Sequence, residues 1–272
     1  MKYKLIAMDL DGTLNNDQKL ISEKTRQALM EAQKNGVRLA LASARPSPGL
    51  FRERDALRLQ DHDGILMSYN GGRIVDAATN KVLFETCMDI EETRQVLRRL
   101  EELPVTPILD DGVQFYVTDK KAYKVDYECV NNRMECTEVE NLADFLNFAP
   151  IKILMSVQPD EIKDVQAQIA AFLPESLIVV QTAAFYLEVI PREINKGQGI
   201  VDICRTIGIT PEEVISFGDA ENDIPMLEGA DFAYCPADGV VASRYETVCN
   251  CADGAVADVI YKKIPEILGI LP

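Results

Sequence analysis

The stretch IAMDLDGTL, residues 6–14, decides the fold expected for this chain. Its apolar residues predict a buried strand that ends in two carboxylates, Asp9 and Asp11, two residues apart. Side chains alternate along a strand, so extended geometry would put both carboxylates on one side. Two like charges this close raise each other's pKa unless a cation or a proton lies between them. Asp-Gly is also a common turn dipeptide, so this stretch alone leaves a simple turn open.

Composition narrows the class of protein. The 272 residues are enough for a large core and two domains. The 44 acidic and 28 basic residues give a formal net charge of -16, which disfavours nucleic acid and anionic membranes as partners. A lysine or a metal ion can still make the local charge of one pocket positive, so the negative net charge does not exclude a small phosphorylated ligand.

The sequence has no disulfide pattern, no signal-peptide core, no membrane span and only one histidine. The seven cysteines are odd in number and mostly scattered, which is not a disulfide framework. The first apolar run is interrupted by acidic residues before a signal-peptide core could form, and no apolar run approaches the roughly 18 residues of a membrane span. We therefore expect a cytoplasmic protein. The single histidine, His62, lies in a polar loop, which disfavours Ser-His-Asp hydrolysis and a zinc site built on imidazole.

Two further segments extend the first strand into a parallel sheet. Ser22 is a candidate N-cap for a helix that precedes a second predicted strand at residues 37–43. Strand, helix and strand in this order form a βαβ unit, whose two strands are parallel. A third strand is predicted at residues 64–68, after a helix. In such sheets ligands bind at the carboxyl ends of the strands, where Asp9 and Ser43 are expected to lie.

The pattern changes between about residues 84 and 189. A helix is predicted first, and short strands and a second helix follow it: helices at 89–103 and 160–172, strands at 107–109, 114–118, 151–157, 177–181 and 185–190. This order differs from the flanking βαβ pattern. It predicts an inserted α+β domain at residues 84–189, within an α/β core made of residues 1–83 and 190–272.

The parallel pattern then resumes and adds another polar strand end. Lys196 lies at the start of a predicted helix, and the strand at 214–217 runs into GDAEND, residues 218–223. Carboxylates at neighbouring strand ends suit Mg2+, while a lysine and a serine supply the charge and the donor that a phosphate needs. We infer phosphoryl transfer, in which one aspartate can attack phosphorus and a second carboxylate can move the proton.

These motifs resemble, in order along the whole chain, those of the haloacid dehalogenase (HAD) superfamily. Residues 9–14 resemble its first motif and residues 218–227 its fourth, while Ser43-Ala44-Arg45-Pro46 and Asn195-Lys196-Gly197 stand in the positions of the second and third. The closest resemblance is to the Cof-type phosphatases, which include sugar phosphatases with an inserted C2-type cap. It implies a HAD-like Rossmannoid core with a central parallel sheet and an inserted α+β cap domain.

The resemblance also implies a role for each site residue. Asp9 would be the nucleophile and a Mg2+ ligand, and Asp11 the general acid and base, with its backbone carbonyl on the metal. Asp219 would complete the protein ligands, and Asp223 would bind through water or anchor them from behind. The groups implied to hold the phosphate are the Leu10 amide, Ser43, the Ala44 amide, Lys196 and Asn222.

Some positions depart from the family pattern or have simpler interpretations. The second motif commonly reads Thr-Gly-Arg-Pro, and Ser43 keeps its hydroxyl, whereas Ala44 narrows the backbone freedom. Relatives often have a strand of small residues where this chain has residues 232–236. The motifs therefore do not determine the wall of the pocket or the identity of the substrate. Ser43 could be only a strand-end cap and Asp223 only a structural acceptor. Asn70, in a Tyr-Asn-Gly-Gly turn, either orients the pocket or supplies the turn.

The expected function is a Mg2+-dependent phosphoric monoester hydrolase for small phosphorylated metabolites, sugar phosphates first. The inserted domain would close over the pocket and contact the rest of the substrate. The candidate contact residues are Asp110, Gln114, Tyr116, Tyr123, Lys124 and Tyr186. The chain would act as a monomer or homodimer, without a nucleic-acid or membrane partner. Two alternatives are a phosphomutase with the same aspartyl-phosphate and a non-catalytic regulatory module that binds Mg2+ and phosphate.

Overall fold

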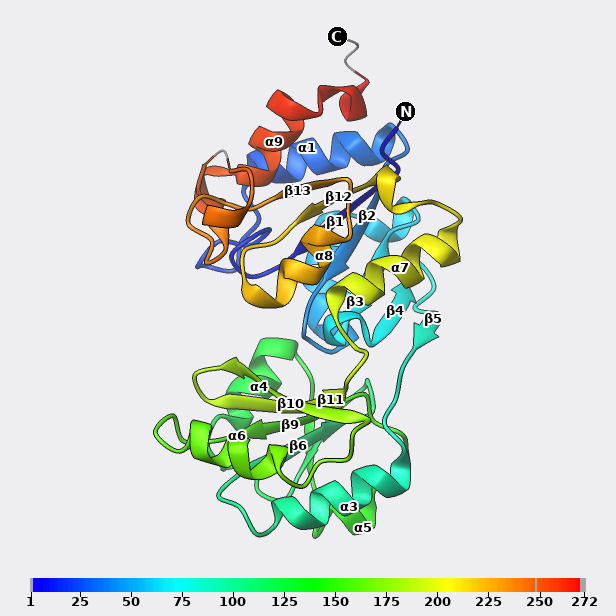
Figure 1. Cartoon of the computed structure of the whole chain (residues 1–272). Coiled ribbons are helices and arrows are strands. Elements are labelled where there is room, and N and C mark those ends of the chain that lie inside the picture. Colours follow the sequence, from blue (N-terminus) through cyan, green and yellow to red (C-terminus); the bar gives the residue numbers. More distant parts are fainter. Residues whose placement is uncertain (1, 248, 270–272) are drawn as a thin grey trace. The chain divides into compact units, whose positions relative to one another are not determined.

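The computed structural model describes residues 2–247 and 249–269. The chain divides into two compact units, Met1–Glu85 with Asn195–Pro272, and Thr86–Ile194 (Figure 1). The second unit extends beyond residue 189, where the sequence places the end of the insertion. The reason is that the last strand of this unit, β11 (Tyr186–Pro191), pairs with two other strands of the same unit.

The first unit is built on a seven-stranded sheet with the strand order β13-β12-β1-β2-β3-β4-β5. Its bounds are β1 Leu5–Asp9, β2 Arg38–Ala42, β3 Ile65–Ser68, β4 Arg73–Asp76, β5 Val82–Glu85, β12 Val214–Phe217 and β13 Phe232–Tyr234. The strands from β13 to β3 pair in parallel, which confirms the predicted parallel sheet. The antiparallel strands β4 and β5 were not predicted, because their turn lacks the Asn-Gly or Asp-Gly signature of a tight hairpin.

Helices cover this sheet, and two of them, Ile224–Glu228 and Ala255–Lys263, were not predicted from the sequence. Their bounds are α1 Glu23–Lys34, α2 Phe51–Ala56, α7 Lys196–Ile207, α8 Ile224–Glu228 and α9 Ala255–Lys263. The side chain of Ser22 accepts a hydrogen bond from the Thr25 amide at 3.2 Å, so the predicted N-cap of α1 is confirmed. Within the part of the chain that the structure describes, we find no helix long and apolar enough to cross a membrane.

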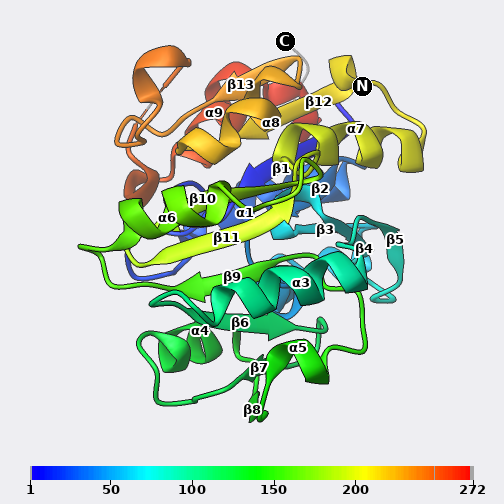
Figure 2. The same cartoon turned by 60° about the horizontal axis from the view of Figure 1, so that its bottom comes forward.

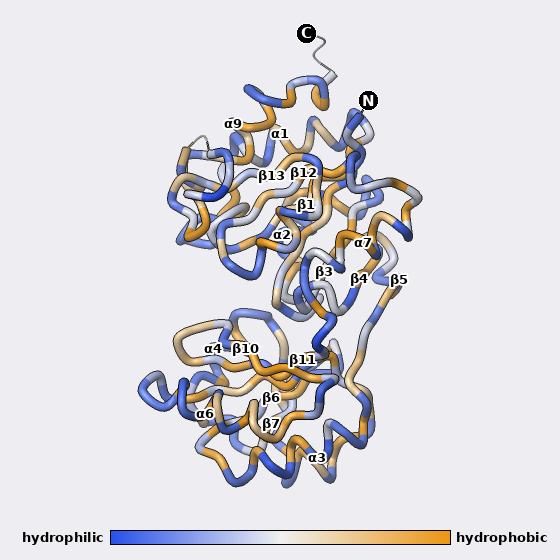
Figure 3. The backbone as a smooth tube through the Cα atoms, in the orientation of Figure 1, coloured by the Kyte–Doolittle hydropathy of each residue, from blue (hydrophilic) through white to orange (hydrophobic). Residues whose placement is uncertain are grey.

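Alternation along β1 divides the core of the first unit into two layers. Ile6 and Met8 pack in one cluster with residues of α1 and α9, whereas Leu5 and Ala7 pack in another with residues of α7 and α8. Figure 1 shows these two pairs of helices on opposite faces of the sheet. Because both faces are covered, residues 5–8 of the strand are apolar and fully buried, and only its last residue, Asp9, is charged. Figure 3 colours the chain by hydropathy. Polar side chains are therefore concentrated at the strand ends.

The second unit contains a six-stranded sheet in the order β10-β11-β9-β6-β7-β8. Figure 2 shows β11, β9, β6, β7 and β8 in succession. The remaining strands are β6 Thr106–Asp110, β7 Phe115–Val117, β8 Cys136–Glu138, β9 Ile153–Ser156 and β10 Leu177–Ala183. All neighbours pair antiparallel except β7 and β8. The mainly antiparallel sheet gives this unit the predicted α+β character.

Helices lie on both faces of this second sheet. Residues of α3 (Ile90–Leu100), α5 (Leu142–Phe145) and α6 (Ile162–Ala170) pack in one cluster, and residues of α4 (Val125–Asn132) pack in another. The sequence did not predict α4. Its N-cap residue, Lys124, makes no side-chain capping bond and has a left-handed backbone, so the usual start signal is missing.

The second unit also contains a buried ion pair. The Nζ atom of Lys152 lies 2.6 Å from Oε1 of Glu188, and both side chains are less than 5% exposed. A buried lysine keeps its charge only next to such a carboxylate, and removing one partner of a buried pair is strongly destabilising. In its burial and its carboxylate partner, Lys152 is therefore comparable to Lys196 of the first unit.

Candidate active site

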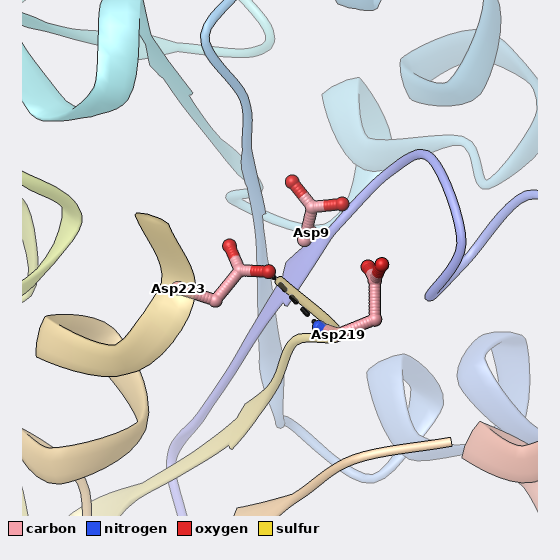
Figure 4. Close-up of side chains that lie close together, drawn as sticks. All are labelled: Asp9, Asp219 and Asp223. Atoms are coloured by element: carbon pink, nitrogen blue, oxygen red, sulfur yellow. Dashed lines mark hydrogen bonds between the residues drawn. The ribbon is translucent and has the colours of Figure 1, made fainter. Parts of the chain in front are cut away.

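Carboxylates from two neighbouring strands meet at one edge of the first sheet. Asp9 is the last residue of β1, and Asp219 follows the end of β12, the parallel neighbour of β1. Asp223 lies four residues further along. One oxygen from each of the three side chains lies within 4.8 Å of the others. Figure 4 shows the three carboxylates gathered around the end of β1.

Lys196 is the cation at the centre of this cluster. It is the first residue of α7, whose N-cap Asn195 accepts a hydrogen bond from the Gln198 amide. Its side chain is fully buried, and its Nζ lies 2.5 Å from Oδ1 of Asp9 and 2.5 Å from Oδ1 of Asp223. Burial would lower the pKa of Lys196, but the two carboxylates raise it above its ordinary value. The amine is therefore protonated and binds both carboxylates.

The cluster still has more carboxylates than cations. Burial raises the pKa of Asp9 to about 7 although Lys196 opposes the shift, and burial raises the pKa of Asp219 to about 6. Asp223 adds to both shifts as a like charge. Three carboxylates facing one ammonium favour a further cation. Their oxygen donors fit a hard cation such as Mg2+.

Asp223 holds the loop that carries Asp219. Its Oδ2 accepts hydrogen bonds from the amides of Asp219 at 2.9 Å and Ala220 at 3.0 Å, the first of which Figure 4 shows as a dashed line. Its Oδ1 accepts from Lys196. Both oxygens thus have partners within the protein. This arrangement suits the anchoring role implied for Asp223 better than direct binding of a metal ion.

Asp11 lies between two cations. Its carboxylate accepts a hydrogen bond from Nη2 of Arg45, and its Oδ1 lies 2.7 Å from Nζ of Lys19. Burial opposes ionisation, but Arg45 and Lys19 together lower the pKa of Asp11 below its ordinary value. The sequence suggested no role for Arg45 or Lys19, although Arg45 belongs to one of the quoted motifs.

Gly12 and Thr13 connect the end of β1 to Asp219. Gly12 has φ +93°, and a Cβ there would lie 2.6 Å from Oδ2 of Asp219, so the position requires glycine. The hydroxyl of Thr13 donates a hydrogen bond to Oδ1 of Asp219 at 2.7 Å. Sequence reasoning missed Thr13, because its partner is 206 residues away and nothing near it indicates the contact.

The groups implied to hold the phosphate lie at the same strand ends. Leu10 follows β1, and Ser43 and Ala44 follow β2, the other parallel neighbour of β1. Ser43 is buried, and its Oγ accepts a hydrogen bond from the Arg45 amide at 3.3 Å. Asn222 lies in the loop after β12, where its Nδ2 donates to Oδ1 of Asn70 at 3.3 Å.

A family model described as haloacid dehalogenase-like hydrolase matches residues 6–260. The chain belongs to this family. Membership confirms the family suggested by the four motifs, and with it the enzyme class, a hydrolase. It also agrees with the carboxylate cluster, because HAD hydrolases generally use Mg2+.

Individual relatives cover almost the whole chain. A protein of Streptococcus pyogenes serotype M6, named "Putative phosphatase M6_Spy0533", is 30% identical over 96% of this chain and 98% of its own length. The 5-amino-6-(5-phospho-D-ribitylamino)uracil phosphatase YbjI of Escherichia coli is 27% identical over 96% of each chain. The crystal structure of a HAD-like hydrolase from Bacteroides thetaiotaomicron superimposes with a TM-score of 0.89 at 28% identity, over 96% of this chain and 99% of the other.

The contact between Thr13 and Asp219 leads to a prediction for this HAD hydrolase. Thr13→Val keeps the shape of the side chain but removes the donor to Asp219, so we expect Mg2+ to bind about 10- to 100-fold more weakly. Titration calorimetry of the protein with Mg2+ measures this directly. Thr13→Ser keeps the hydroxyl and should bind Mg2+ nearly as the wild type does. Equal affinity of Thr13→Val and wild type would contradict the role of this contact.

The candidate substrate-contact residues of the second unit lie on both faces of its sheet. Tyr116 packs in the cluster of α3 and α5, and its hydroxyl accepts from Gln114. Tyr186 packs in the cluster of α4, and its hydroxyl donates to the carbonyl of Lys124 at 2.8 Å. Asp110 is buried at the end of β6, and Nζ of Lys124 lies 5.7 Å from the ring centre of Tyr123. Contact of any of them with substrate stays a prediction.

Proposed function

We propose that this HAD hydrolase is a Mg2+-dependent phosphatase that acts on small phosphorylated metabolites, sugar phosphates first, through an aspartyl-phosphate on Asp9. The observation that carries the proposal is the arrangement of Asp9 itself. It is a buried carboxylate at the end of β1, bound by Lys196 and close to two further carboxylates. A carboxylate held in this way is suited to attack a phosphorus atom once the charge of the phosphate is neutralised.

The reaction divides into two steps. In the first, an oxygen of Asp9 forms a bond to phosphorus while the bond from phosphorus to the ester oxygen breaks, and protonated Asp11 gives its proton to the departing alkoxide. In the second, a water molecule attacks the phosphorus of the aspartyl-phosphate, Asp11 takes up the proton, and Asp9 leaves as a carboxylate with release of phosphate. Asp11 thus returns to its protonated form for the next turnover.

The charged groups of the chain support these two reaction steps. Lys196 stays protonated and offsets negative charge on Asp9 and on the phosphoryl group. Arg45 and Lys19 hold Asp11 ionised, which is the form that the second step needs. In the first step Asp11 must carry the proton that it gives to the alkoxide, and both cations oppose this because they stabilise the ionised carboxylate. We infer that substrate binding moves the Asp11 carboxylate away from them.

Mg2+ would be held by Asp9, Asp219 and the Asp11 carbonyl, with Asp223 behind them. When bound, it would neutralise the phosphate and polarise its oxygens. The excess of carboxylates over cations and the hydroxyl of Thr13 on Asp219 support this assignment. Ser43, Asn222, Lys196 and the amides of Leu10 and Ala44 remain the proposed phosphate-binding groups.

The proposed substrate class draws on the relatives and on the inserted unit. The Escherichia coli relative is named for a phosphorylated ribityl compound, which is a small phosphate monoester. We propose that residues 86–194 are the cap domain that selects such substrates, in a monomeric or homodimeric protein of the cytoplasm.

The experiment measures free phosphate from a panel of sugar phosphates, nucleotides, pyridoxal phosphate and 5-amino-6-(5-phospho-D-ribitylamino)uracil, with Mg2+ and with excess EDTA. Mg2+-dependent release from one or more sugar phosphates is the expected result. If phosphate is released only from monoesters other than sugar phosphates, the proposed substrate class is wrong. An isomeric sugar phosphate in place of free phosphate would identify a phosphomutase, and hydrolysis that persists in EDTA would contradict the metal dependence.

A further inference from the structure

Three consecutive residues after β3 have a left-handed backbone. Tyr69 has φ +53°, Asn70 +55° and Gly71 +99°. Glycine adopts this region freely and asparagine tolerates it, but other L-amino acids rarely do, so Tyr69 is the strained residue of the three. Such strain persists only where surrounding contacts impose it, and it is frequent at functional sites. The contacts of this loop therefore indicate its purpose.

The first contact is with the loop after β2. The Asn70 amide donates a hydrogen bond to the Ser43 carbonyl at 2.8 Å, and the Tyr69 amide donates to the Arg45 carbonyl at 3.0 Å. These bonds join the segment after β3 to the segment after β2, beyond the ends of both strands. The left-handed backbone thus sets the path of the segment that carries the Ser43 hydroxyl.

The second contact is with the first turn of α7. A Cβ on Gly71 would lie 2.7 Å from the carbonyl oxygen of Asn195 and 3.2 Å from the Cα of Gly199. This close approach of two backbones requires glycine at residue 71. Lys196 lies in the same turn. The contact with the loop therefore also restricts the position of the Lys196 backbone.

The third contact is made by the Asn70 side chain. Its Oδ1 accepts a hydrogen bond from Nδ2 of Asn222 at 3.3 Å, and Asn70 itself is only 9% exposed. Asn222 is more exposed, so this bond restricts an amide that would otherwise rotate freely. One short loop therefore contacts the three segments that carry Ser43, Lys196 and Asn222.

We infer that Asn70 is a positioning residue, whose side-chain oxygen orients the Asn222 amide toward the phosphate of the substrate. The inference rests on the proposed phosphatase function. An asparagine serves both needs of this position, because it tolerates the left-handed backbone and supplies the acceptor.

The test separates the backbone from the side chain. Asn70→Gly keeps the left-handed conformation and removes the acceptor, whereas Asn80→Gly makes the same change at a second left-handed asparagine, in the turn between β4 and β5. We expect Asn70→Gly to lower kcat/KM for p-nitrophenyl phosphate roughly 3- to 10-fold and to weaken inorganic phosphate binding, measured by calorimetry with Mg2+, by a similar factor. Asn80→Gly should change neither quantity.

A double-mutant cycle then tests whether Asn70 acts through Asn222. Asn222→Ala should reduce phosphate affinity in the wild type but have a much smaller effect in Asn70→Gly. The inference would be overturned if Asn70→Gly bound phosphate as tightly as the wild type. It would also be overturned if the double variant lost affinity by the product of the two single losses. An active wild type with an unaffected Asn70→Gly would overturn the positioning role alone, whereas a wild type that hydrolyses no phosphate ester would overturn the proposed function.

Discussion

Asp9→Asn is expected to reduce phosphate release by at least about 10³-fold, because an amide is a poor nucleophile toward phosphorus. Asparagine has nearly the shape of aspartate, so the end of β1 should keep its structure. The change also removes a negative charge from a cluster where Asp9 already has its pKa raised to about 7 by burial. We therefore expect the fold to be at least as stable. Steady-state kinetics and thermal unfolding of the same preparation measure both effects.

The control for this substitution is Asp17→Asn, which makes the same chemical change at an exposed aspartate in the first unit. It should leave kcat and KM unchanged. Hydrolysis by Asp9→Asn at a rate near that of the wild type would refute Asp9 as nucleophile. If activity is lost together with the folded structure, the experiment reports on folding, and circular dichroism distinguishes that case.

Lys196→Met is expected to lower kcat/KM by about 10²- to 10³-fold, because the variant lacks the charge that offsets the phosphoryl group and Asp9. It should also lower the free energy of unfolding by about 3 kcal/mol in the absence of Mg2+, since the cation between Asp9 and Asp223 is gone while both carboxylates remain buried. Added Mg2+ should restore part of this stability, because a divalent cation supplies charge to the same carboxylates.

The loss of stability in Lys196→Met should also depend on pH. Without Lys196 the folded protein holds a proton on Asp9 more tightly than in the wild type, while the unfolded chain titrates near the ordinary aspartate pKa. The folded variant then binds more protons than the unfolded chain above that pKa. Its stability therefore falls as pH rises toward 8, and the difference from wild type is smaller near pH 5. Urea unfolding at the two pH values measures this difference.

Two other lysines serve as controls. Lys152→Met removes a lysine that is similarly buried and paired with Glu188 in the second unit, so it should cost a comparable amount of stability, which Mg2+ does not restore. Lys34→Met removes an exposed lysine of α1 and should change neither stability nor activity. A stability loss in Lys196→Met that Mg2+ leaves unchanged would argue against a metal ion at the carboxylate cluster.

Local sequence features predicted the elements that have strong local signals. The apolar run before Asp9 predicted β1, and Ser22 predicted the start of α1, because both signals depend on residues within a few positions. The hairpin of β4 and β5 and the helix α4 were missed. The hairpin lacks a turn dipeptide, and α4 follows Lys124, which is not a capping residue. Such elements form because tertiary packing compensates for weak local preference.

The candidate site divides in the same way. The residue types and their order along the chain were enough to identify Asp9, Lys196 and Asp219 as candidates, because parallel strands bring their carboxyl ends to one edge of a sheet. The contacts that orient those groups required the structure. Thr13 on Asp219 and Asn70 on Asn222 join residues more than 150 positions apart.

The sequence by itself thus determined the parallel sheet, the family and the chemistry available at its edge, since these follow from residue type and order. Only the tertiary structure decided that Lys196 binds both Asp9 and Asp223, that Asp11 lies between Arg45 and Lys19, and that a left-handed loop holds Asn222. The physical reason is that hydrogen bonds and ion pairs depend on distances and directions between side chains, which are fixed only when the strands pair and the helices pack on them.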